Sequence, residues 1–147
     1  MNQYTAYLRV RHPSIDPGEI TRVLGIEPAH AWAAGSPRDG APATRGPHQE
    51  SYWFAPLGER LWPSGLAGAV PVAPFEAFLL AQIRLLTPHK GFFARLSTDG
   101  GTCELAVTLS AGDRCTVELP AALLRSLAEL NIAITLEIST GDEPVSH

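Results

Sequence analysis

The chain has 147 residues, of which 45% are hydrophobic and 18% are charged, and this composition predicts one globular domain over residues 1–147. The sequence contains neither an apolar run long enough to span a bilayer nor a signal segment at its start, so we expect a cytoplasmic protein without membrane contact. The net charge of −4 argues against a nucleic-acid partner, which usually needs a clustered excess of Lys and Arg.

The first predicted strand is Tyr4–Arg11, because apolar and polar side chains alternate along it. A short helix is predicted next, over Pro17–Leu24. Its start is marked by Asp16, which suits an N-cap, and by Glu19 three residues later, as in a capping box. Gly25 can adopt the left-handed conformation that closes a helix, so this helix has signals at both ends.

A long loop separates this helix from the next strand. Ala29–Ala34 is predicted to be extended, and the polar, aperiodic stretch from about 35 to 50 is predicted to be a mobile surface loop. Ser51–Ala55 is aromatic and predicts a strand. The glycines and prolines spread over Pro56–Val72 predict irregular structure.

The second half of the chain contains two predicted helices, each marked by apolar residues at helical spacing. Between them, the turn-forming residues at 99–101 and 111–113 predict two hairpins that connect three strands. Asn131 tolerates the left-handed conformation and is expected to close the last helix. In chain order the predicted elements are a helix over Ala73–Thr87, strands over Gly91–Thr98, Cys103–Ser110 and Arg114–Leu119, a helix over Pro120–Leu130, a strand over Ile132–Ile138 and a polar tail over 141–147.

The predicted elements follow the order β-α-β-α-β-β-β-α-β. Hairpins next to helical crossovers predict an α+β fold, in which a mainly antiparallel sheet has helices packed on one face. In the predicted register the two cysteines, Cys103 and Cys115, are too far apart to form a disulfide. We therefore expect two buried thiols that stay reduced.

One part of the sequence resembles a known family. The motif LGIEP at Leu24–Pro28, followed by Trp32 and Gly35, is similar to the bacterial family named domain of unknown function 4279. At the end of the last strand the resemblance implies an aromatic residue, whereas this chain has Ser139. The family name carries no activity, so the resemblance implies an architecture and no site residues. That architecture is a strand before the capped helix, an aromatic strand after a variable loop and a closing helix–strand pair, at Tyr4–Arg11, Tyr52-Trp53-Phe54 and Leu123–Ile138.

The first candidate site is the loop between two tryptophans. The loop could close over a pocket in which two arginine side chains bind an anion. The other interpretation is that both tryptophans belong to the core and both arginines are solvated loop charges. The cluster consists of His30, Trp32, Arg38, Arg45, His48 and Trp53, of which Trp32, Arg38, Arg45 and Trp53 are the candidate ligand-binding residues.

The second candidate site is the sheet face that the helices leave open. Alternation along the strands places aromatic and oppositely charged side chains on this face. Such a mixture suits a protein interface, either with a second copy of the chain or with a different protein. It is equally compatible with an ordinary solvated face. The residues predicted to lie there are Tyr7, Arg9, Arg11, Glu104, Thr108, Thr135 and Glu137.

No metal site, cofactor site or catalytic motif is predicted. The 5 histidines lack the spacing of zinc ligands, and no nucleophile motif or phosphate-binding glycine loop occurs. We predict a non-enzymatic protein-binding module whose partner is another protein or a second copy of the chain. The alternative is a small-molecule or anion binder, or an enzyme, that uses a pocket under the loop between Trp32 and Trp53.

Overall fold

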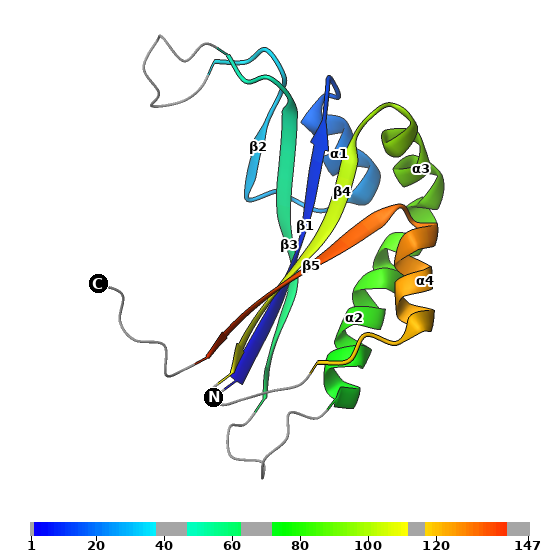
Figure 1. The fold of residues 1–147 in the computed structure, drawn as a ribbon. Coiled ribbons are helices and arrows are strands. Elements are labelled where there is room, and N and C mark those ends of the chain that lie inside the picture. The colour runs from blue at the N-terminus through cyan, green and yellow to red at the C-terminus, as the bar shows by residue number, and fades with distance from the viewer. Residues whose placement is uncertain (1, 38–46, 63–71, 112–116, 141–147) are drawn as a thin grey trace, which may run out of the picture.

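In the computed structural model the chain forms a five-stranded sheet with the spatial order β2-β3-β1-β4-β5. The helices lie on one side of this sheet, which confirms the predicted α+β class (Figure 1). The structure describes residues 2–37, 47–62, 72–111 and 117–140. The elements are β1 (Asn2–His12), α1 (Pro17–Leu24), β2 (His30–Trp32), β3 (Ser51–Trp62), α2 (Val72–Leu86), the 3₁₀ helix η2 (Thr87–His89), α3 (Lys90–Thr98), β4 (Thr102–Ala111), α4 (Ala121–Glu129) and β5 (Ile132–Thr140).

β1 lies at the centre of the sheet, between β3 and β4. It pairs antiparallel with both neighbours, and β2 pairs antiparallel with β3. The pair β4–β5 is parallel, and α4 supplies the crossover that a parallel pair requires. The sheet is therefore mainly antiparallel, as predicted, with one parallel pair at its edge.

α1 has the predicted bounds and both of the predicted capping residues. The carboxylate of Asp16 accepts the N–H of Gly18 at 3.0 Å, and Gly25 closes the helix with a left-handed φ of 71°. Glu19 was expected to complete a capping box, but its carboxylate pairs with Arg95 of α3 at 3.1 Å. The side chain of Glu19 therefore joins two helices.

Residues 90–98 form a helix, α3, so the predicted strand over Gly91–Thr98 is wrong. The adjacent Phe92 and Phe93 have a high strand propensity, which explains the wrong prediction. Phe92, Phe93 and Leu96 are all buried, and the i and i+4 positions share one face of a helix. Burial of that face against the rest of the core decides the conformation.

The turn after α3 closes the helix and does not form a hairpin. Gly100 is left-handed, with φ 94°, and its N–H donates to the carbonyl of Ser97 at 3.1 Å. The N–H of Gly101 donates to the carbonyl of Leu96 at 2.8 Å. These two bonds form a Schellman motif. Glycines mark hairpins and helix ends alike, so the sequence signal at 99–101 was ambiguous.

The predicted strand over Arg114–Leu119 is also wrong where the structure describes it. β4 has β1 on one side and β5 on the other, so both of its edges are already paired. Val117 and Leu119 lie outside any strand and pack against the core. Residues 112–116 lie outside the described part of the chain.

β3 extends well past its predicted end at Ala55, so the irregular structure predicted from Pro56 is wrong for residues 56–62. The register with β1 shifts next to Pro56, which lets the strand accommodate a residue that lacks an N–H. β2 pairs only with residues 52–54, so farther along β3 no strand formed by described residues lies beside this edge. Residues 63–71 are not described.

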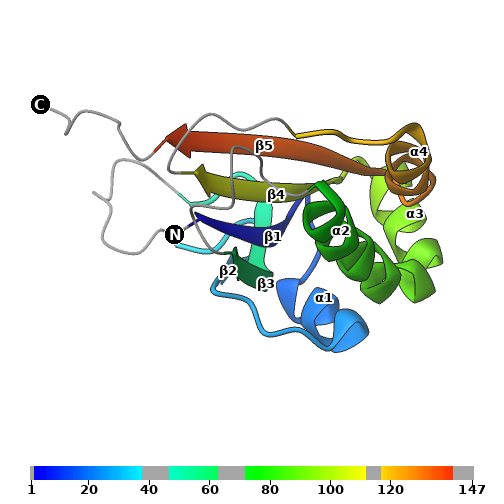
Figure 2. The same cartoon turned by 90° about the horizontal axis from the view of Figure 1, so that it is seen from below.

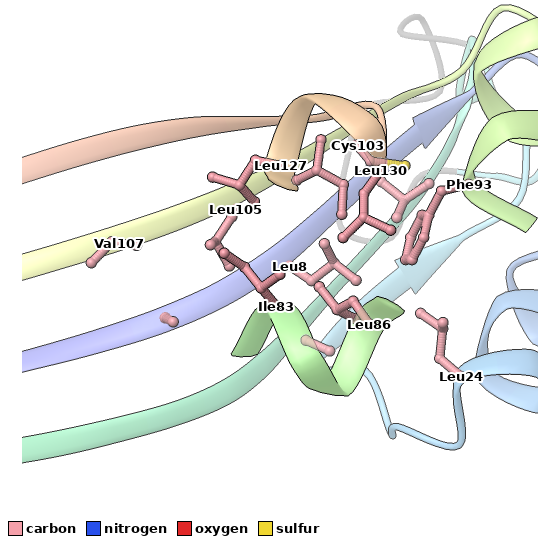
Figure 3. Close-up of a cluster of buried hydrophobic side chains, with 14 of the residues drawn as sticks. Leu8, Leu24, Ile83, Leu86, Phe93, Cys103, Leu105, Val107, Leu127 and Leu130 are labelled. Atoms are coloured by element: carbon pink, nitrogen blue, oxygen red, sulfur yellow. The ribbon is translucent and has the colours of Figure 1, made fainter. Parts of the chain in front are cut away.

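The core lies between the helices and one face of the sheet. Figure 2 shows the same arrangement from below, with the helices on one side of the strands. Leu8, at the centre of the sheet, is fully buried. Figure 3 shows part of this core, with Leu8 and the buried side chains of Leu24, Ile83, Leu86, Phe93, Leu105, Val107, Leu127 and Leu130.

Three further expectations concern the cysteines, the loop and tail, and membrane-spanning helices. Cys103 is a free, buried thiol, and its burial raises the pKa to about 12, so it is protonated at neutral pH. Cys115, most of the predicted mobile loop at 35–50, and the tail at 141–147 lie outside the described residues. Among the helices that are described, none combines the length and apolar character needed to cross a membrane.

Candidate functional site

The open face of the sheet carries the residues predicted for a partner surface. Leu8 and Val10 of β1 are fully buried on the helix side, so Tyr7, Arg9 and Arg11 project from the opposite side. We call this opposite side the outer face. The same alternation brings Glu104 of β4 to the outer face, opposite Arg9, and Thr135 and Glu137 of β5 also lie there.

Four aromatic residues form a cluster on this face, over β1, β2 and β3. Trp32 stacks on Tyr52 and on His48, with ring centroids 4.5 and 4.3 Å apart. Tyr7 stacks on Phe54 at 4.9 Å. Tyr52 and Phe54 alternate with buried Trp53 along β3, which places both on the outer face. The aromatic cluster is therefore Tyr7, Trp32, Tyr52 and Phe54.

The rings of this cluster stand upright on the sheet. The planes of Trp32 and Tyr52 differ by 20° and those of Tyr7 and Phe54 by 17°, so each pair is nearly parallel. Their separations match the spacing of about 4.8 Å between neighbouring strands. Rings stacked from strand to strand at that spacing have planes perpendicular to the inter-strand direction. The cluster consequently turns ring edges outward.

Hydrogen bonds fix the loop ends beside the cluster. The hydroxyl of Ser51, a buried residue at the start of β3, donates to the carbonyl of Ile15 at 2.5 Å and accepts the N–H of Ala34 at 2.9 Å. The carbonyl of His48 accepts the N–H of Gly35 at 2.9 Å. These bonds hold His48 where its ring can stack on Trp32.

Arg9 links the aromatic cluster to β4. Its Nη1 donates to Glu104 at 2.5 Å and its Nε donates to the hydroxyl of Tyr52 at 3.3 Å. The guanidinium carbon lies 5.3 Å from the centroid of the Phe54 ring, a cation–π distance. Thr135 donates to the second carboxylate oxygen of Glu104. All of these contacts cross between strands, so they join β3, β1, β4 and β5 on one surface.

These contacts shift the pKa values of Glu104 and Arg9 in opposite directions. The hydrogen bond from Thr135, reinforced by Arg9, lowers the pKa of Glu104 against the opposing effect of partial burial. The hydrogen bond to Tyr52 raises the pKa of Arg9, and Glu104 adds to that effect. Both side chains are therefore charged at neutral pH.

We expect Glu104→Gln to lower the free energy of unfolding by about 1 kcal/mol at neutral pH, because the hydrogen bonds lost involve a charged group in a partly buried position. The pKa of Glu104 is lowered in the folded state, so its charge stabilises the fold above the ordinary glutamate pKa of about 4.3. That stabilisation is lost as the pH falls through the folded-state pKa. The difference between wild type and variant, measured by urea unfolding, should therefore be constant above about pH 4.3 and should shrink as the pH falls below it.

Glu137→Gln provides the control for this prediction. Glu137 lies on the same face and is exposed, and its side chain makes no hydrogen bond or ion pair with another described residue. Its substitution should change the free energy of unfolding by no more than about 0.5 kcal/mol. The same pH trend in both variants would contradict a specific role for Glu104.

Of the first candidate site, the structure brings Trp32 and His48 together but separates Trp32 from Trp53. Trp32 is 36% exposed on the outer face, whereas Trp53 is fully buried on the helix side and donates its indole N–H to Thr21 of α1 at 3.0 Å. The two tryptophans therefore cannot line one pocket, which corrects the predicted arrangement. Arg38 and Arg45 lie outside the described residues.

Sequence reasoning missed half of the aromatic cluster. Tyr52 and Phe54 were counted only as strand formers, although alternation with a buried Trp53 would have placed both on the outer face. The stacking of His48 on Trp32 had no sequence signal, because it depends on how the loop returns to β3. His30, the other histidine of the predicted cluster, lies 6.2 Å from Phe54, ring to ring.

Among the described residues, histidine, cysteine and carboxylate side chains do not gather into a metal site. Within the described ranges, no three of them are placed to hold one ion. His12 is buried, and its Nδ1 accepts the N–H groups of Ser14 and Ile15 at 3.0 and 2.9 Å. This histidine therefore holds the turn that follows β1.

Comparison with known proteins gives the family. The family model described as Domain of unknown function (DUF4279) matches residues 2–141, nearly the whole chain. No curated protein and no solved structure matches the chain. The match includes the motif at Leu24–Pro28, Trp32 and Gly35 on which the sequence resemblance rested, and also the capped helix and the closing helix–strand pair that it implied. The chain belongs to the DUF4279 family.

Proposed function

We propose that the chain is a non-enzymatic protein-binding module and that the outer face over β2, β3 and β1 is its binding surface. The observation that supports this most strongly is the gathering of Trp32, Tyr52 and Arg11 on the outer face. Tryptophan, tyrosine and arginine are the residues that most often dominate the binding energy of protein interfaces. We also propose a cytoplasmic location, which suits the free thiol of Cys103.

The orientation of the rings favours a protein partner over a nucleic acid. Proteins that bind single strands stack bases on exposed ring faces. In the aromatic cluster Trp32 lies between the rings of His48 and Tyr52, and the guanidinium groups of Arg9 and Arg11 lie over Phe54 and Tyr52, so much of the ring-face area is already covered. Upright rings instead offer edges and gaps into which the side chains of a partner can pack. The net charge of −4 favours the same choice.

The proposal is tested by purifying the tagged wild-type chain and its variants from the cells that express them and comparing the proteins that co-purify with each. We expect the wild-type chain to retain a protein partner, or to dimerise as measured by light scattering. The double variant Tyr7→Ala/Trp32→Ala should weaken that binding by at least about tenfold, because interface aromatics of this kind are typical hot spots. Circular dichroism should show that the variant keeps its fold.

A matched control lies on the opposite side of the molecule. Leu85 of α2 and Leu124 of α4 are exposed apolar residues, at 51% and 41%, and neither lies on the outer face. The double variant Leu85→Ala/Leu124→Ala should bind the partner as the wild type does. A partner lost from this control and kept by the aromatic variant would place the binding surface on the helices and refute the proposal.

A further inference from the structure

A small hollow lies on the outer face, next to the aromatic cluster and between β1, β4 and β5. Its volume is about 150 Å³. It exists because two short side chains, those of Thr102 and Ala133, lie beside longer ones on neighbouring strands. The lining residues are Arg9, Arg11, Thr102, Cys103, Glu104 and Ala133.

The acidic residue of this hollow is already engaged. One carboxylate oxygen of Glu104 accepts from Arg9 and the other from Thr135. Arg9 in turn divides its donors between Glu104 and the hydroxyl of Tyr52. Two arginines therefore face one carboxylate in the hollow. Arg9 makes the direct contact with Glu104, whereas Arg11 acts on it only at longer range, so the excess positive charge lies on the Arg11 side.

Arg11 has no comparable partner among the described residues. It forms a long ion pair with Glu50, whose carboxylate lies 3.9 Å from Nε, beyond hydrogen-bond length, and both side chains are 52% exposed, so this pair is weak. Its guanidinium carbon lies 6.0 Å from the centroid of the Tyr52 ring, so the arginine rests beside the aromatic cluster. The two terminal nitrogens, which form the fork that matches a carboxylate, make no hydrogen bond within the described part of the chain.

We propose that this hollow binds a carboxylate side chain of the partner protein, through the terminal nitrogens of Arg11. The inference rests on the proposed function, since it names the chemistry of the partner at the same surface. The volume suits a side-chain carboxylate and falls below the roughly 300 Å³ of the smallest usual small-molecule pockets. The partner segment should therefore carry Asp or Glu next to apolar residues that pack against the aromatic cluster.

Selection from a library of random peptides displayed on phage tests this inference. Peptides selected on the wild-type chain should share one acidic position flanked by apolar residues. Arg11→Gln should weaken a selected peptide by about tenfold or more, because a charge-assisted bidentate contact is lost. Replacing the acidic residue of the peptide by its amide should have the same effect, and the two changes together should add little. Fluorescence anisotropy measures the affinities.

Arg95→Gln is the matched control, because Arg95 is an exposed arginine of α3 whose partner, Glu19, lies on α1. It should leave peptide binding unchanged. Glu50→Gln should strengthen binding a few-fold, since it removes the nearest competing carboxylate.

The remaining outcomes separate this inference from the proposed function. Peptides that lose affinity with Trp32→Ala but show no acidic preference would leave the proposed function standing and refute the carboxylate site. Inorganic phosphate that displaces the peptide through Arg11 at equal concentration would assign the hollow to free anions, and so refute a protein carboxylate. Binding that is insensitive to Trp32→Ala, or a library that yields no binder, would count against both.

Discussion

Replacing Trp53 by alanine should lower the free energy of unfolding by about 3–5 kcal/mol, the usual cost of deleting a large buried aromatic. Trp53 is fully buried on the helix side of the sheet, and its indole N–H donates to Thr21 at 3.0 Å. The substitution leaves a cavity beneath α1 and an unpaired threonine hydroxyl. Urea unfolding followed by circular dichroism measures the loss without relying on tryptophan fluorescence.

Trp32→Ala is the same chemical change on the opposite face of the sheet and serves as the control. Trp32 is 36% exposed and stacks on His48 and Tyr52, so we expect a loss of only about 1 kcal/mol. If Trp53→Ala does not fold, Trp53→Phe should still lose more stability than Trp32→Ala. Equal losses at the two positions would contradict their placement on opposite faces.

The parts of the fold that the sequence predicts well are those specified by local signals. α1 was predicted from Asp16 and Gly25, whose capping roles act within a few residues of the helix. The left-handed Asn131 after α4, with φ 58°, follows the same rule. The two alternating strands β1 and β4 were also predicted, because a period of two determines which side of a sheet each residue occupies.

The mispredicted elements are those that depend on tertiary pairing. The sequence places a strand after Cys103–Ser110, but whether β4 pairs with it or with β5 is decided by packing across the whole sheet. Pro56 breaks an isolated strand, yet here it lies at a register shift on an edge. Neither circumstance is visible within a short window of sequence.

In the candidate site, too, the features set by local pattern were predicted and those set by tertiary pairing were not. Tyr7, Arg9 and Arg11 were placed on the outer face by alternation alone. The pairing of Trp32 with Trp53 was inferred from closeness in sequence around one loop, and the pleat of β3 instead separates them. The hollow beside Arg11 needs Thr102 and Ala133 as neighbours across two strands, which only the register provides.

Gly101→Ala should lower the free energy of unfolding by about 3 kcal/mol, at the upper end of the usual cost of overpacking. A Cβ at this position would lie 2.9 Å from the carbonyl oxygen of Leu96 and 3.0 Å from that of Arg11, both of which are backbone atoms. It would also lie 2.8 Å from the Cδ2 atom of His12. That ring cannot easily move, because its Nδ1 accepts two backbone N–H groups.

Gly91→Ala, near the start of α3, is the control. It makes the same Gly-to-Ala change as Gly101→Ala, but at a position where the added Cβ meets no neighbouring atom. A Cβ at Gly91 meets nothing within 4 Å, and alanine has a higher helix propensity than glycine. This variant should therefore be more stable than the wild type by up to about 1 kcal/mol. Urea unfolding of the pair should give changes of opposite sign. A destabilised Gly91→Ala variant would argue that residues 90–98 are not helical, and a neutral Gly101→Ala variant would argue that α3 does not end against β1.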